Sequence, residues 1–123
     1  MQRVLEWCAD RGISVEVGPT RDCYDLATRT IYIRSGQSRF ATLAGLLHEC
    51  GHALLDSTRA GRWPDGYVSP RPRGLKYSVE VLLEEVEAWH RGERLAKRLG
   101  VKLDTRRYRR IRNACLAGYA RKC

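Results

Sequence analysis

Residues 39–56 read RFATLAGLLHECGHALLD, a stretch that is almost entirely apolar and contains no proline. The run is too long for a single strand, and it is too short and too polar to span a membrane. Ser38, directly before it, is a residue type that commonly caps the start of a helix. The stretch therefore predicts a buried helix whose apolar character is interrupted only by His48, Glu49 and His52.

His48 to His52 read HECGH, an instance of the pattern H-E-x-x-H. Residues four apart lie on one face of a helix, so both imidazoles can reach one metal ion. Glu49 then points toward the metal and can take a proton from the attacking water. A chain of this length contains the pattern by chance roughly once in several hundred cases. The alternative, two hydrogen-bonded core histidines, would also bury Glu49 and require a partner for it. The pattern predicts a catalytic zinc site with His48 and His52 as ligands and Glu49 as general base.

A catalytic zinc site usually has a third protein ligand. Residues 78–99 predict a second helix, and Gly100 stands where a C-cap glycine is expected. Glu85 is the one carboxylate at the centre of the apolar face of this helix, and a buried carboxylate requires a cation or many hydrogen bonds. Glu85 is therefore the predicted third ligand, and Glu84 at the edge of the face is the alternative. His90 falls on the polar face and is expected at the surface. The apolar face also contains Val81, Leu82, Ala88, Trp89, Gly92, Ala96 and Leu99. The small residues Ala88 and Gly92 beside Glu85 are expected to permit close approach to the small residues around Gly45 on the first ligand helix.

The motif HECGH, followed on the next helix by EVEAW at residues 85–89, resembles zincin metallopeptidases with an E-x-x-A pattern after the zinc motif. The likeness is greatest to the small ImmA/IrrE-like metallopeptidases and covers residues 22–99, including a strand at residues 30–33 before the zinc helix. It implies a minimal zincin fold, a peptidase activity and Glu85 as the third zinc ligand. Trp89 departs from the pattern, since such families often have Asn or Asp there. The substrate class is left open by the resemblance.

Residues 57–77 contain four arginines and all the prolines but one, which predicts a long loop. Because the loop joins the two ligand helices, it is expected to pass near the metal. A zinc hydrolase needs a donor for the developing oxyanion in addition to the metal. Tyr67 and Tyr77 suit this catalytic role as neutral donors, Arg71 and Arg73 are further candidates, and the sequence does not choose among them.

The formal net charge is +9, and residues 104–123 contain seven Lys and Arg against one acidic residue. Tyr108, Ile111, Cys115 and Tyr119 recur at helical spacing, so residues 104–121 predict an amphipathic basic helix. Two interpretations of the helix are open. It forms a surface for nucleic acid or for an acidic partner, or it is a packed terminal helix with a solvated face.

The five cysteines are an odd number and contain no C-x-x-C spacing. A secretory signal is not expected, because Arg3, Glu6 and Asp10 break the N-terminal stretch, and no apolar run is long enough for a membrane span. These features predict a cytoplasmic protein with reduced thiols and no membrane partner.

The remaining patterns complete a single predicted domain of the α+β class, with a first helix at residues 2–11, a strand at 13–17 and a hairpin of strands at 23–26 and 30–34. We expect a minimal zincin-like fold, in which a small β-sheet packs on the zinc helix beside the second ligand-bearing helix. The expected function is zinc-dependent hydrolysis of a protein or peptide substrate. The alternatives are a non-catalytic, nucleic-acid-associated or regulatory protein that keeps the metal site, and zinc-dependent hydrolysis of a different bond.

Overall fold

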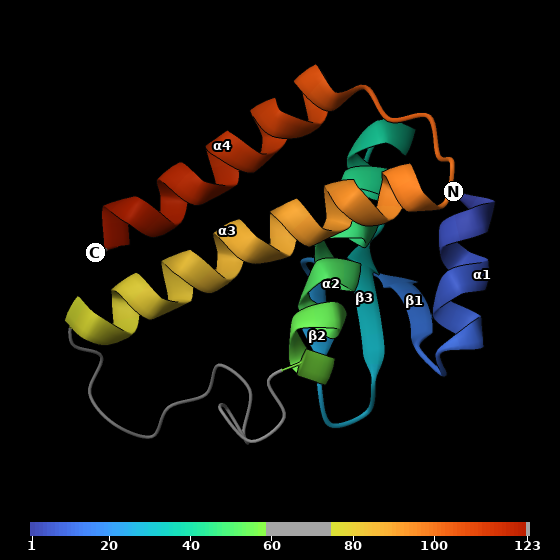
Figure 1. Ribbon diagram of the computed structural model, residues 1–123, viewed down its shortest axis with the longest axis horizontal. Coiled ribbons are helices and arrows are strands. Elements are labelled where there is room, and N and C mark those ends of the chain that lie inside the picture. Colours follow the sequence, from blue (N-terminus) through green and yellow to red (C-terminus); the bar gives the residue numbers. More distant parts are fainter. Residues whose placement is uncertain (59–74, 123) are drawn as a thin grey trace.

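The computed structural model describes residues 1–58 and 75–122 and has an α+β fold (Figure 1). The described elements are α1 (Gln2–Asp10), β1 (Ser14–Gly18), β2 (Cys23–Asp25), β3 (Thr30–Arg34), α2 (Arg39–Thr58), α3 (Leu75–Arg98) and α4 (Thr105–Lys122). Each of these corresponds to a helix or strand that the sequence predicts, with boundaries that differ by a few residues. None of the described helices is long and apolar enough to cross a membrane.

The sheet has the strand order β1-β3-β2. β2 and β3 form the predicted antiparallel hairpin, with Tyr24 opposite Ile31. β1 pairs with the other edge of β3 in parallel, with Val15 opposite Ile31, a pairing that the sequence did not predict. Ile31 and Ile33 of the central strand are buried in the core. The sheet is therefore held to the helices mainly through β3.

α2 packs against β2 and β3 and, elsewhere on its surface, against α3. Ser38 caps it as predicted, since the Ala41 N–H donates to Ser38 Oγ at 3.1 Å. The side of α2 that faces away from the histidines joins the core: Leu46, Leu47 and Cys50 are buried. Cys50 Sγ lies 3.5 Å from Cys8 Sγ of α1, and both thiols are free. The zinc-motif helix is thus surrounded by the rest of the fold.

Two glycines let α2 and α3 approach until their backbones are in contact. A Cβ atom at Gly51 of α2 would collide with the backbone carbonyl of Ala88, and a Cβ atom at Gly92 of α3 would collide with the carbonyl of Leu47. The sequence predicted a close approach at Ala88 and Gly92, but it placed the opposing surface at Gly45. That part was wrong, because the space at Gly45 is filled by the Asp22 carboxylate instead.

α3 ends at a Schellman motif. The Gly100 N–H donates to the Lys97 carbonyl at 3.1 Å and the Val101 N–H donates to the Ala96 carbonyl at 2.9 Å, with Gly100 at φ 70°. The chain then reverses, and α4 runs back antiparallel to α3 (Figure 1). Tyr108 anchors α4, because its buried hydroxyl donates to the Trp89 carbonyl of α3 at 2.8 Å.

We expect Gly51→Ala to lower the free energy of unfolding by about 1–3 kcal/mol, because the new methyl group forces α2 and α3 apart. The matched control is Gly118→Ala on α4, where a Cβ atom meets nothing within 4 Å. That change should raise stability by up to about 1 kcal/mol through helix propensity. Urea denaturation measures both, and a Gly51→Ala protein as stable as the wild type would contradict the close contact.

Candidate metal centre

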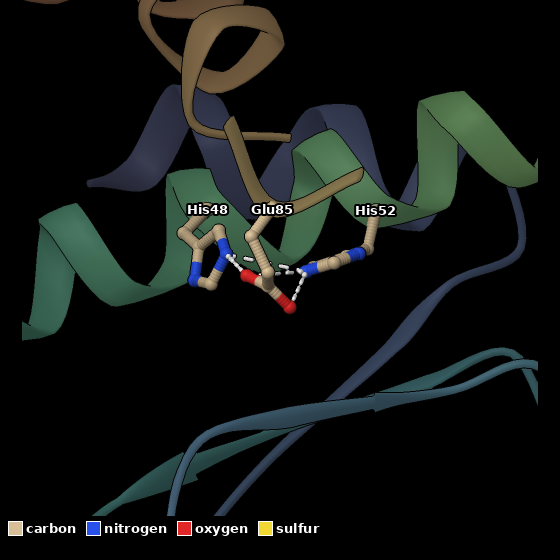
Figure 2. Close-up of side chains that lie close together, drawn as sticks. All are labelled: His48, His52 and Glu85. Carbon is tan, nitrogen blue, oxygen red and sulfur yellow. Dashed lines mark hydrogen bonds and ion pairs between the residues drawn. The ribbon is translucent and has the colours of Figure 1, made fainter. Parts of the chain in front are cut away.

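His48 and His52 extend from successive turns of α2, and Glu85 of α3 places its carboxylate between their rings (Figure 2). His48 Nε2 lies 3.2 Å from His52 Nε2 and 2.7 Å from Glu85 Oε2. His52 Nε2 lies 3.3 Å from the same carboxylate oxygen. Within the described residues, this group is the one set of three or more His, Cys, Asp or Glu side chains that could hold a metal ion.

The spacing of these donors fits a metal ion. Two imidazole nitrogens and one carboxylate oxygen bound tetrahedrally at about 2.0 Å would lie about 3.3 Å from one another. Two of the three separations, 3.2 and 3.3 Å, agree with this spacing, and the third, 2.7 Å, is somewhat shorter. The three side chains that the sequence predicted as ligands can therefore hold one metal ion together.

The site favours a positive charge. Burial alone would lower the pKa of His48, but hydrogen bonds with Glu49 and Glu85 outweigh it and raise this pKa to about 9. Burial would raise the pKa of Glu85, and the hydrogen bonds with His48 and His52 bring it well below its usual range. A divalent cation would supply the same compensation for the buried Glu85 carboxylate that a protonated imidazole supplies.

Glu49 is 4% exposed and lies beside the first ligand, with its Oε2 3.4 Å from His48 Nδ1. Both residues line a pocket of about 320 Å³. The predicted general base and one predicted ligand therefore face the same cavity, which is where a substrate would meet them.

Trp89 holds the ring of His48 by stacking. The two ring centroids are 4.1 Å apart and the planes differ by 8°. Trp89 in turn contacts Tyr108 of α4 edge-on, at 5.3 Å between centroids. In the described part of the chain, the buried Trp89 Nε1 has no hydrogen-bond partner. Trp89 thus fixes the imidazole through its ring face instead of through the polar group that Asn or Asp would offer at this position.

α4 forms one wall of the pocket through Ile111, Cys115 and Tyr119. Tyr119 lies near the Glu85 carboxylate, and burial followed by this negative charge raises the pKa of Tyr119. The sequence showed these residues as an apolar stripe but did not connect the stripe with the metal site. The structure therefore adds Tyr119 to the surroundings of Glu85.

Of the other predicted site residues, Tyr67 lies outside the described residues. Tyr77 was placed in the loop, and that placement was wrong, because α3 already begins at Leu75. Its side chain is outside the described part of the structure. His90 is exposed, as predicted, while Glu84 is buried but does not belong to the metal-binding group.

Comparisons with known protein families, with curated proteins and with solved structures found no match to this chain.

We expect Glu85→Gln to weaken zinc binding by about 10-fold or more, because an amide oxygen replaces a charged ligand and even neighbouring groups contribute on this scale. Glu87→Gln is the matched control, because Glu87 lies on the same helix, pairs with Arg91 at 3.1 Å and does not belong to the metal-binding group. Titration of metal-depleted protein with Zn²⁺ measures both affinities. Equal zinc affinities for the wild type and Glu85→Gln would show that Glu85 is not a metal ligand.

Proposed function

We propose that the protein is a zinc-dependent metallopeptidase with a zincin-like site. The observation that carries this proposal is that Glu49 and His48 line one pocket while His52 and Glu85 complete the donor set. A purely structural metal site has no use for a buried carboxylate next to a ligand and open to a cavity. A pocket of about 320 Å³ is within the size range of ligand sites.

Zinc suits the donor set, since two imidazoles and one carboxylate form the protein part of known catalytic zinc sites and leave a position open. When bound, zinc would polarise the scissile carbonyl and lower the pKa of the attacking water. His48, His52 and Glu85 would hold the ion. The +9 charge of the chain does not decide between this role and a non-catalytic one, whereas the position of Glu49 favours catalysis.

The protein's own residues transfer the proton and orient the side chains that would bind the metal. Glu49 accepts the proton of the attacking water and delivers it to the nitrogen of the leaving amine. Trp89 keeps the His48 ring in its orientation by stacking on it, and Tyr119 lies near the Glu85 carboxylate. The roles of Glu49 and of the ligands are thus separable by substitution.

Glu49→Gln should retain zinc and the fold while losing about 100-fold or more of the turnover, because an amide cannot accept the proton. The measurement is incubation with a cell lysate followed by mass spectrometry of newly formed peptide termini. Glu16→Gln serves as the control, because it removes a carboxylate from an exposed position on β1.

Cleavage products that are equally abundant with the wild type and with Glu49→Gln would contradict the mechanism. Tight zinc binding with no new termini in any lysate would favour the non-catalytic alternative.

Nucleic-acid binding is the second candidate function, and one feature of α4 favours it. Arg106 and Arg110, four residues apart on the helix, are exposed and have no ionic partner among the described residues. Other arginines of the helix are engaged: Arg109 pairs with Glu93 at 3.0 Å, and Arg107 lies over the Phe40 ring at 4.3 Å. The free pair can reach two phosphates.

If this surface binds duplex DNA, replacing Arg106 and Arg110 with Gln should reduce the slope of log affinity against log salt concentration by about 2, one unit for each lost phosphate contact. Replacing Arg94 and Arg98, which are exposed on α3, with Gln removes the same charge elsewhere and should leave the slope nearly unchanged. Fluorescence anisotropy with a labelled duplex measures the slopes. Absence of binding at low salt would leave α4 as a packed helix with a solvated face.

A further inference from the structure

The pocket beside the metal centre has a cationic end. Arg21, two residues before β2, and Arg34, the last residue of β3, both line it and are both exposed. Within the described residues, neither guanidinium forms an ion pair or a side-chain hydrogen bond. These two side chains are therefore free to bind a group that enters the pocket.

The acidic residue between them, Asp22, forms no ion pair with either guanidinium in the described part of the chain. Asp22 Oδ1 accepts a hydrogen bond from the Arg34 backbone N–H at 2.7 Å and another from Gln37 Nε2 at 3.2 Å. Its other oxygen lies against Gly45 of α2, in the space that a Cβ atom there would occupy. Asp22 thus joins the turn before α2 to the helix, and its carboxylate is engaged with the protein.

We propose that this end of the pocket recognises a carboxylate of the substrate through Arg21 and Arg34, an inference that rests on the proposed peptidase function. A guanidinium presents two parallel N–H donors that match the two oxygens of a carboxylate. Unpaired guanidiniums at the mouth of a partly apolar pocket bind such a group more strongly than they would in open solvent. The substrate class is therefore an acidic peptide.

The position of the carboxylate along the peptide follows from α2. Two residues of α2 line the pocket: Ala41, in the first turn of the helix and so nearest in the chain to Arg34, and His48 of the candidate metal centre. These residues are seven apart, which is about 10 Å along a helix. An extended peptide covers that length in about three residues. The carboxylate is thus expected within about three residues of the scissile bond, either as an Asp or Glu side chain or as the free C-terminus.

The first arm of the test measures cleavage. Zinc-loaded wild type is incubated with a random decapeptide library, synthesised once with C-terminal amides and once with free acids, and the products are sequenced by mass spectrometry. Enrichment of Asp and Glu within three residues of the cut in the amidated library identifies side-chain recognition. Cleavage confined to the free acids, about three residues from the C-terminus, identifies recognition of the terminal carboxylate.

The second arm measures binding without turnover. Immobilised, zinc-loaded Glu49→Gln protein is exposed to the same two libraries, and the retained peptides are identified. We expect acidic peptides to be retained at least about 10-fold over their neutral counterparts. Replacing Arg21 and Arg34 with Gln in this background should bring that ratio close to one. Replacing Arg94 and Arg98, which are exposed on α3 and do not line the pocket, should leave the ratio as it is.

The outcomes separate the two proposals. Cleavage without any carboxylate preference would overturn the recognition of acidic peptides and leave the peptidase function standing. Retention of acidic peptides that depends on Arg21 and Arg34, without cleavage by the wild type, would support the carboxylate site and count against the peptidase. An equal loss of retention with the Arg94 and Arg98 variant would show that only the overall charge matters and would overturn the proposed site, as would the absence of retention.

Discussion

The backbone contact between α2 and α3 is the constraint on which the candidate metal centre depends. Glu85 can reach both imidazoles only because the two helices touch without intervening side chains at Gly51 and Gly92. Gly51 is one of the two unspecified positions of the H-E-x-x-H motif. Although it has no metal-binding role itself, it allows the helix contact that brings Glu85 close to the two histidines. Gly92 lies two helical turns after Glu85, on the same face of α3. Packing and ligand geometry are therefore set by a single helix crossing.

This crossing also concentrates negative charge inside a strongly basic protein. Glu49, Glu84 and Glu85 are all buried near the crossing, although the chain carries a net charge of +9. Buried carboxylates are costly unless a cation or several hydrogen bonds compensate them. The histidines provide part of that compensation, and a metal ion would provide more. Arg21 and Arg34 are instead exposed at the pocket, where an anionic substrate would approach first.

The grouping of the three candidate ligands could be predicted from sequence because each rests on a periodic pattern. The four-residue spacing of His48 and His52 and the central position of Glu85 on an apolar face are properties of single helices. The remaining wall of the site could not be predicted in this way. Arg21 and Arg34 reach the pocket only through the β2–β3 pairing and the turn held by Asp22, and neither shows a local signal.

Two errors have the same physical origin. The expected contact at Gly45 was inferred from small residues near the histidines, but small residues allow any close neighbour, and here the neighbour is the Asp22 side chain. The loop was expected to extend to Tyr77 because its prolines and glycines disfavour a helix, yet these stop at Gly74, and α3 begins at Leu75. In each case the prediction used a local residue preference alone, whereas the outcome depends on a tertiary contact or on where the helix begins.

The orientation of the His48 ring is fixed by packing from α4, a role that a hydrogen bond from Asn or Asp could otherwise fill. Trp89 lies between Tyr108 and His48, so the edge-on contact from α4 fixes the indole and the stacked indole fixes the imidazole. The Tyr108 hydroxyl secures the same position through the Trp89 carbonyl, and Tyr119, eleven residues further along α4, lies near Glu85. The orientation of His48 is thus fixed from α4 through Trp89. The aromatic residues of its apolar stripe contribute to the metal centre, while its free arginines face outward.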